Sequence, residues 1–400
     1  MTRGSSQAVQ FVATTAILAW GLAPGRLASG MPGRIRETLR SDLMSRADYD
    51  RMERGYYEQL LDAGRKLGAP VVAELQRVGA GRGPSQVCQS VDDIREFVLK
   101  PSLSIIQPVG VSWSTNELAM RDRAYPVAKP LNTIRIGLMG DSIGAGWGVG
   151  DDLGFEPILE SWFDERSRRR GGPGIEILNF AVPGRSAGQR WHHFLEVGWP
   201  MDPDLVLVES TQADVGWAVR RLRELLPRGI GWDSPLYREL LEACGVGPGE
   251  SGSYYERALQ SHTWEFTAAA YRAIAEGCSA RGVPSVWILI PRVGRTVESE
   301  DHHRLVELAR DAGFSAIIDV SDAFDGIDPT TLTARSDDYH PNAKGHALLA
   351  RRIDEALWNH PVLVELLTRD RSPDSSPSEP APSVADDDLA SESLQAGGGG

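Results

Sequence analysis

Two short segments of the chain carry residues whose types and spacing suit nucleophilic catalysis. The first, GDSIGAG at residues 140–146, places Ser142 directly after a short apolar run. A hydroxyl on a strand-to-helix turn gains from nearby backbone N–H groups, which can also hold a developing oxyanion. The second, SDDYHPNAKGH at residues 336–346, places Asp337 three residues before His340. A carboxylate there can hold the Nδ1 proton of the imidazole and direct Nε2 toward a serine. Together the three residues predict an activated serine nucleophile.

Each segment alone also has a plainer interpretation. The glycines near Ser142 could form a structural turn or cradle a phosphate, although the dinucleotide pattern GxGxxG and the P-loop Lys-Ser/Thr ending are both absent. Asp337 could cap the following helix while His340 lies on the surface. Because both segments are expected at one edge of the same sheet, the catalytic interpretation is favoured over coincidence.

The elements that would position these residues follow from the apolar pattern after Thr133. Short apolar runs alternate with helical stretches, as in a parallel sheet with crossover helices. The predicted strands are 134–139, 175–180, 205–210, 285–290 and 315–320, and the predicted helices are 155–168, 186–198, 255–281, 300–312 and 342–358. Five such strands make an open, doubly wound sheet of flavodoxin type the most economical α/β topology, with ligands bound beyond the carboxyl ends of the strands.

With these motifs in place, the sequence resembles the SGNH/GDSL hydrolase family of serine esterases and lipases over about Val111 to Leu357. The resemblance rests on IGLMGDSIGAGWGVG around Ser142, on NFAVPG after the second strand and on DDYHPNAKGH after the last. It implies a three-layer α/β/α fold and a triad of Ser142, Asp337 and His340. It also implies that Gly184, which alone would fit a plain turn, offers its backbone N–H to the oxyanion.

The third motif departs from the family pattern. Members usually carry GxND after the third strand, with the asparagine side chain as an oxyanion donor, whereas this chain has Ala213 at that position of ESTQAD. Either Gln212 supplies an amide from one residue earlier, or the oxyanion hole works with the N–H groups of Ser142 and Gly184. Loss of one such donor typically costs about 10²–10³ in kcat, which leaves a slow enzyme rather than none.

The stretch 214–264 is an insertion after the third strand, longer than a direct crossover. Its aromatic residues could form a lid or stacking wall beside the site, or a small satellite core; they are Trp217, Trp232, Tyr237, Tyr254 and Tyr255. The histidine pairs at 192–193 and 302–303 are expected on helix surfaces, because neighbouring helical side chains point in different directions. The expected chemistry requires no metal and no organic cofactor.

Composition limits the partners. Over 400 residues, 42 basic and 55 acidic side chains give a net charge of −13, which argues against a nucleic-acid partner. Cys88, Cys244 and Cys278 are widely spaced and allow at most one disulfide bond. The expected partner is a small-molecule, carbohydrate or lipid ester, and the sequence leaves the oligomeric state open.

Four regions are expected along the chain. Residues 1–30 read as a signal peptide or membrane anchor, 31–130 as a helical extension with a lead-in, 131–365 as the hydrolase domain, and 366–400 as a disordered acidic tail. The first of these is also consistent with a buried amphipathic helix. The favoured interpretation predicts an exported or envelope-associated protein, with membrane association through the N-terminus, and the alternative a cytoplasmic one.

The sequence therefore predicts a serine hydrolase that cleaves carboxylic esters through an acyl-enzyme intermediate. Two alternatives stay open. An O-acyltransferase would use the same triad to pass the acyl group to a carbohydrate hydroxyl, and a pocket that excludes water would favour it. A catalytically silent protein of the same fold would only bind; Ala213 is its best support, and the intact Ser142, Asp337 and His340 are its main obstacle.

Overall fold

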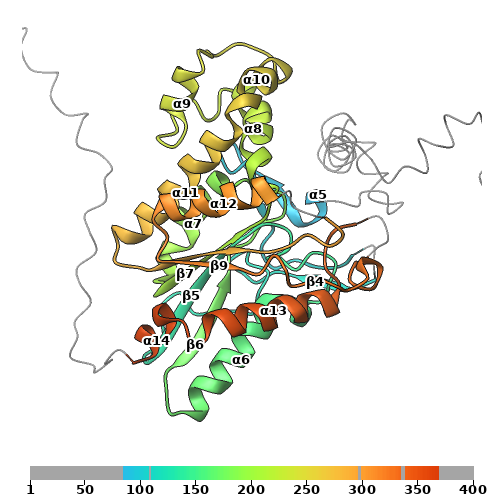
Figure 1. The fold of residues 1–400 in the computed structure, drawn as a ribbon, viewed down its shortest axis with the longest axis vertical. Helices are drawn as coiled ribbons and strands as arrows, with labels where there is room; N and C mark the ends of the chain where they lie inside the picture. Colours follow the sequence, from blue (N-terminus) through green and yellow to red (C-terminus); the bar gives the residue numbers. More distant parts are fainter. Residues whose placement is uncertain (1–83, 108–109, 296–298, 335–337, 369–400) are drawn as a thin grey trace, which may run out of the picture. The chain divides into compact units, whose positions relative to one another are not determined.

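The computed structural model describes residues 84–107, 110–295, 299–334 and 338–368 (Figure 1). The chain divides into two units, residues 1–86 and 87–400. The predicted signal peptide or anchor, the helical pattern expected before residue 84 and the predicted acidic tail beyond Thr368 lie outside the described residues.

The second unit is built on a five-stranded parallel sheet. Its strands are β5 (Thr133–Met139), β6 (Gly174–Asn179), β7 (Leu205–Ser210), β8 (Ser285–Leu289) and β9 (Ala316–Asp319), arranged in the order β6-β5-β7-β8-β9. The first two crossovers therefore run in opposite directions, and the chain order reverses between β5 and β7. Every residue of β5, β6, β7 and β8 is buried, as expected for a parallel sheet covered on both faces. The predicted doubly wound α/β sheet of flavodoxin type is confirmed.

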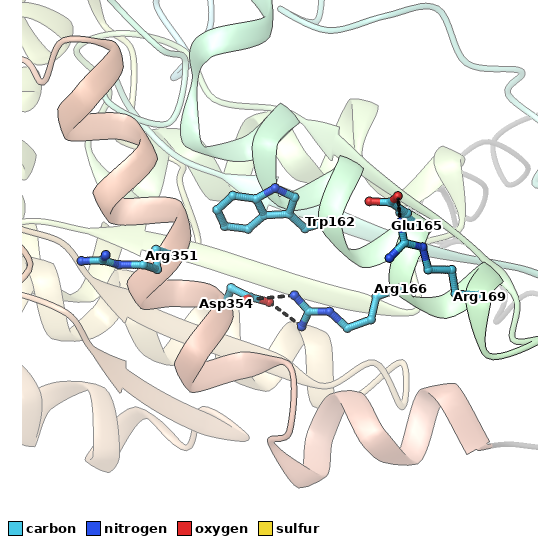
Figure 2. Close-up of a pocket in the computed structure, with 6 residues that line it drawn as sticks. All are labelled: Trp162, Glu165, Arg166, Arg169, Arg351 and Asp354. Atoms are coloured by element: carbon cyan, nitrogen blue, oxygen red, sulfur yellow. Dashed lines mark hydrogen bonds and ion pairs between the residues drawn. The ribbon is translucent and has the colours of Figure 1, made fainter.

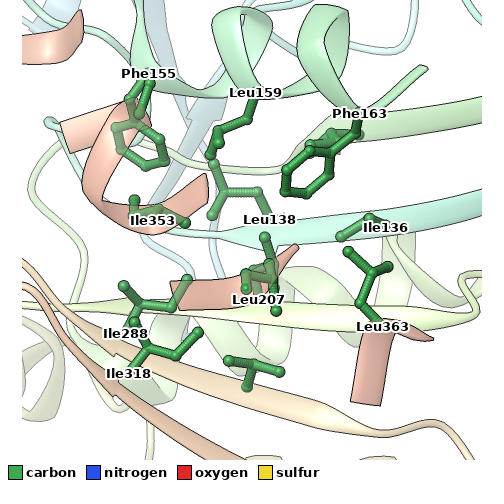
Figure 3. Close-up of a cluster of buried hydrophobic side chains, with 14 of the residues drawn as sticks. Ile136, Leu138, Phe155, Leu159, Phe163, Leu207, Ile288, Ile318, Ile353 and Leu363 are labelled. Atoms are coloured by element: carbon green, nitrogen blue, oxygen red, sulfur yellow. The ribbon is translucent and has the colours of Figure 1, made fainter. Parts of the chain in front are cut away.

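Helices cover both faces of this sheet and complete the three layers (Figure 1). One face carries α6 (Phe155–Arg169), α13 (Ala343–Leu357) and α14 (Pro361–Thr368). Figure 3 shows the core that they form with the strands, in which Phe155 and Phe163 pack over Leu138 and Leu207. This core is continuous from α6 to α14, so one face of the sheet is fully covered.

The opposite face carries α7 (Ala187–Val197), α11 (Thr263–Ser279) and α12 (Ser299–Ala312). Here Phe194 and Tyr271 pack with Val206 and Val208 of β7, whereas Leu207 of the same strand belongs to the other core. Successive side chains of a strand point to opposite faces, so each strand supplies both cores. The two cores together confirm the α/β/α layering.

The segment between β7 and β8 holds α8 (Asp214–Leu225), α9 (Arg238–Ala243), α10 (Gly252–Leu259) and α11. The single helical stretch predicted over 255–281 is two helices, separated by a 3₁₀ turn at Gln260–His262. Several of the aromatic residues noted in the insertion pack together with Leu222 and Phe266 in a third hydrophobic cluster; they are Trp232, Tyr237, Tyr254 and Tyr255. These four rings therefore contribute to a satellite core.

Two small antiparallel hairpins precede the parallel sheet. The first pairs β1 (Cys88–Ser90) with β2 (Phe97–Leu99), and the second pairs β3 (Ser104–Ile106) with β4 (Ser112–Ser114). Short helical pieces complete the described elements: α5 (Pro84–Val87), η2 (Asp151–Leu153), η3 (Trp199–Met201), η4 (Leu226–Arg228) and η6 (Pro329–Thr331). The hairpins supply backbone and side-chain contacts to the loops around Ser142 and Gly184.

Candidate active site

Ser142 lies on the turn that follows β5, at the carboxyl edge of the sheet. β5 pairs with β6 on one side and β7 on the other, and the chain order reverses between β5 and β7. In open α/β sheets this reversal opens a crevice beyond the strand ends, where ligands bind. The topology therefore places the predicted nucleophile at the edge where a substrate would sit.

The structure brings Ser142 and His340 into contact. His340 Nε2 lies 2.8 Å from Ser142 Oγ, although 198 residues separate them along the chain. Both residues are almost fully enclosed, with 2% of Ser142 and 1% of His340 exposed. The distance suits transfer of the hydroxyl proton to the imidazole.

The other imidazole nitrogen meets a carboxylate. His340 Nδ1 lies 2.6 Å from Asp338 Oδ1, which also accepts the backbone N–H groups of Tyr339 and His340. Burial alone raises the pKa of Asp338, but the charge of His340 and these hydrogen bonds outweigh it and hold the pKa below the ordinary value. A carboxylate that stays ionised at this point can fix the imidazole tautomer.

Asp337, the carboxylate expected from the DxxH spacing, lies in the gap at 335–337 outside the described residues. Its role stays a prediction. Sequence reasoning passed over Asp338, although the adjacent pair of aspartates offered both positions. An aspartate two residues before a histidine can bond the backbone of the same turn, but spacing along the chain carries no signal that selects Asp338 over Asp337.

The turn after β6 holds Gly184, whose φ of +79° lies in the left-handed region. Its carbonyl accepts a hydrogen bond from Arg221 of α8. Within the described residues, the N–H groups of Ser142 and Gly184 have no protein acceptor. By contrast, the N–H groups of Asp141 and Gly144 both bond the Glu209 carboxyl group. The role of these two N–H groups as oxyanion donors stays a prediction.

The third predicted oxyanion donor is the side-chain amide of Gln212. Gln212 is half-buried and follows β7, and no hydrogen bond joins its amide to any residue of the described ranges. Ala213 is the N-cap of α8, and its N–H donates to Thr211 Oγ1 at 3.2 Å. The role of Gln212 as an oxyanion donor stays a prediction.

A buried arginine shapes the loop that follows Ser142. Arg121 donates to the carbonyls of Ala145, Gly146 and Val149 at 2.6, 2.9 and 2.7 Å. A Cβ at Gly146 would lie 2.1 Å from Arg121 Nη1, and the φ of +61° there also favours glycine. The guanidinium also lies over the ring of Trp113 in β4. The lead-in segment thus holds the loop through charge-assisted hydrogen bonds.

Four side chains form a buried charged cluster at the turn that carries Ser142. They are Asp141, Arg190, Glu209 and Asp214, all at least nine-tenths buried. Burial, aided by repulsion from Asp141, raises the pKa of Glu209 well above its ordinary value. Sequence reasoning missed this group; its one signal was Glu209, a charged residue in an apolar run expected to be covered on both faces.

A depression of about 380 Å³ lies elsewhere, between α6 and α13 (Figure 2). Arg166 there makes a bidentate pair with Asp354 at 2.8 and 2.9 Å. Trp162 and Arg351 also line it, and none of its lining residues belongs to the Ser142 site. The depression is therefore separate from the contacts around Ser142.

The histidine pairs singled out in the sequence lie on α7 and α12. His192 Nε2 lies 3.4 Å from Ser234 Oγ, and His302 Nε2 lies 2.7 Å from Asp319 Oδ2. Among the residues that the structure describes, no group of three or more His, Cys, Asp or Glu side chains could hold a metal ion. Across the same four ranges, no helix combines the length and apolar character needed to cross a membrane.

Comparison with known proteins places this site in a family. The family model described as GDSL-like lipase/acylhydrolase matches residues 138–348, slightly more than half of the chain. A search of curated proteins gave no match. The matched range runs from the end of β5 into α13 and includes Ser142, Gly184 and His340.

Solved structures of esterases are similar at low identity. A two-domain esterase active on acetylated mannans matches 63% of this chain and 54% of its own, with 16% identity and a TM-score of 0.35. The esterase EstA from Pseudoalteromonas sp. matches 57% and 97%, with 15% identity and a TM-score of 0.35. A mutant of the acetylxylan esterase Axe2 from Geobacillus stearothermophilus matches 57% and 95%, with 14% identity and a TM-score of 0.37. The chain spans about half the length of the two-domain esterase.

The second histidine of the last motif, His346, generates a testable prediction about acid stability. His346 is fully buried in α13 and accepts the N–H of Phe155 through Nδ1 at 3.1 Å. Burial lowers its pKa from 6.5 to about 3. The unfolded chain therefore binds this proton at a higher pH than the folded chain does, and stability falls as the pH drops below the unfolded pKa.

We expect His346→Asn, whose amide oxygen can replace Nδ1 as the acceptor, to reduce this acid sensitivity. Between pH 6 and pH 4 the wild type should lose roughly 1.4 kcal/mol more per pH unit than the variant. Urea unfolding at several pH values measures the difference. Equal pH slopes for the two proteins would contradict the assignment of His346 as a buried neutral group.

Proposed function

Because the chain belongs to the GDSL-like lipase/acylhydrolase family, we propose that it cleaves carboxylic esters through an acyl-enzyme formed on Ser142. The family places it among hydrolases that act on ester bonds. The observation that carries the finer proposal is the 2.8 Å contact between Ser142 Oγ and His340 Nε2, with a carboxylate on the other imidazole nitrogen. That order of groups turns a weak hydroxyl nucleophile into a strong one.

In the proposed reaction, Ser142 Oγ attacks the ester carbonyl carbon while His340 Nε2 takes the hydroxyl proton. The carbonyl π electrons move to the oxygen, and the resulting oxyanion accepts hydrogen bonds from the N–H groups of Ser142 and Gly184, with Gln212 as a third donor. Collapse of this intermediate breaks the bond to the alcohol, which leaves with the proton from His340. Water then attacks the acyl-enzyme by the same route, releasing the acid and restoring Ser142.

The carboxylate that orients His340 is assigned to Asp338 on geometry. Its contact with Nδ1 at 2.6 Å and its low pKa support this choice. Asp337 remains the alternative that the family motif implies. Because the two residues are adjacent, matched amide variants can separate them.

Reactivity of the serine tests the proposal as a whole. We expect a fluorophosphonate probe to label the wild type and not Ser142→Ala, because only an activated hydroxyl attacks the phosphorus. Hydrolysis of p-nitrophenyl acetate should fall by several orders of magnitude in the variant. Circular dichroism of both proteins checks that they are folded. A well-folded wild type that is neither labelled nor active would make a silent binding protein the better interpretation.

The matched pair Asp338→Asn and Asp337→Asn tests the orienting carboxylate. We expect Asp338→Asn to lower kcat by about 10⁴-fold, the loss produced when a triad carboxylate becomes an amide. Asp337→Asn should keep kcat near the wild-type value. The reverse result, a large loss in Asp337→Asn alone, would move the role to Asp337.

One observation favours a second candidate function, transfer of the acyl group to a carbohydrate hydroxyl. Ser142 and His340 are only 2% and 1% exposed, and a site that excludes water favours an alcohol acceptor over hydrolysis. Esterases of similar fold include one active on acetylated mannans, so mannose oligosaccharides are a suitable acceptor. Mass spectrometry of reactions with p-nitrophenyl acetate should detect acetylated sugar if transfer dominates, and acetate alone if the protein is a hydrolase.

A further inference from the structure

We propose that Arg190 and Glu209 are positioning residues that fix two turns relative to each other. These are the turn at residues 140–146 that carries Ser142 (the nucleophile turn) and the turn after β6 that holds Gly184 (the oxyanion turn). This inference rests on the proposed function of Ser142. Neither side chain contacts His340 or replaces a member of the triad. Their contribution would be the placement of the Ser142 and Gly184 backbone N–H groups.

Glu209, near the end of β7, holds the nucleophile turn from below. Its Oε2 accepts the N–H groups of Asp141 at 3.2 Å and Gly144 at 2.8 Å, which flank Ser142 in the chain. A Cβ added at Gly140 or Gly144 would lie 2.2 Å from the same oxygen. The glycines of this motif thus make room for a buried carboxyl group, which bonds the backbone on both sides of the nucleophile.

Arg190 connects β7, the strand that carries Glu209, to two further segments. It lies on α7, whose N-cap Ser186 comes two residues after Gly184. Its Nη1 donates to the Glu209 carbonyl at 2.8 Å, and its Nη2 donates to Asp214 Oδ1 at 2.8 Å. The same Nη2 lies 3.5 Å from Asp141 Oδ2. One guanidinium therefore contacts the nucleophile turn, the end of β7 and the start of α8, from the helix that follows the oxyanion turn.

Asp214, another member of the charged cluster, is also held by a hydrogen bond from α11. Tyr271 of α11 donates to Asp214 Oδ2 at 3.0 Å, and its hydroxyl lies 2.7 Å from Ser210 Oγ. Asp214 therefore cannot follow a displaced Arg190 without breaking contacts to α11. A shift of the guanidinium would instead be transmitted to Asp141 and to the turn around Ser142.

The charge state of Glu209 decides which replacements keep its hydrogen bonds to the nucleophile turn. The carboxylates of Asp141 and Asp214 contact the Arg190 guanidinium, whereas Glu209 contacts it through its backbone carbonyl. Burial raises the pKa of Glu209 well above its ordinary value. A neutral Glu209 still accepts both N–H groups through its carbonyl oxygen. A glutamine offers the same acceptor without a charge, whereas a leucine would leave two buried N–H groups without one, a costly state.

A matched arginine exists at the opposite edge of the sheet. Arg135, near the start of β5, is fully buried and donates to Glu176 at 2.8 Å and to the carbonyls of Pro126 and Met201. It resembles Arg190 in burial and in its mixture of carboxylate and carbonyl partners. It differs in lying at the amino end of its strand, away from Ser142.

The test compares Arg190→Lys with Arg135→Lys for p-nitrophenyl acetate turnover, fluorophosphonate labelling rate and Tm. Misplacement of reacting groups by about 1 Å can cost 10²-fold in rate, so we expect Arg190→Lys to lower kcat and the labelling rate roughly 10- to 100-fold. KM should change by less than about twofold, because binding is not the step affected. Arg135→Lys should lower Tm while its kcat stays within about twofold of the wild-type value.

Glu209 provides a second measurement that does not depend on how well the arginine variants fold. Glu209→Gln should keep kcat within roughly threefold, and Glu209→Leu should lose roughly 10- to 100-fold. Wild-type kcat in Arg190→Lys, equal kcat losses in the two arginine variants, or equal activity of the two Glu209 variants would each overturn the inference. An inactive and unlabelled wild type would overturn the proposed function, and this inference with it.

Discussion

The parallel pairing of β5 with β7 is the contact on which the site depends. Ile136 to Met139 run beside Leu205 to Val208, so both strands end at the same edge of the sheet. The turn after β5 carries Ser142, and β7 carries Glu209 near its end. The two cores on either face, which share β7 through alternate residues, keep this pairing in register, because a one-residue slip would turn every buried side chain to the wrong face.

The strands and their order could be predicted because each lies in a sheet covered on both faces and therefore reads as a short apolar run. The approach of Ser142 and His340 to each other could be predicted because both follow strands whose carboxyl ends meet. The break within 255–281 could not, because helical spacing continues through Gln260 to His262. The choice between Asp337 and Asp338 depends on the local backbone, which spacing along the chain does not specify.

The buried charges were beyond sequence reasoning for a different reason. Arg190 lies in a helix with an amphipathic sequence pattern, and Glu209 is a single charged residue in an otherwise apolar stretch of its strand. The contacts of these two residues require α7, β5, β7 and α8 to be in place together, because each contact joins residues 19 to 68 positions apart. The buried ion pair of Arg190 with Asp214 is also weak evidence of stability by itself, since desolvation of the charges offsets much of their attraction. Its value here lies in geometry.

The space that Glu209 occupies has a consequence for how this chain can vary. Its Oε2 fills the volume that a methyl group would need at Gly140 and at Gly144, so the three positions constrain one another. Alanine at either glycine would require the Glu209 carboxyl group to move, and its hydrogen bonds to the two backbone N–H groups would change with it. A change at any one of these three positions therefore acts on the other two. A designer moving this turn into another scaffold would have to move the glutamate with it.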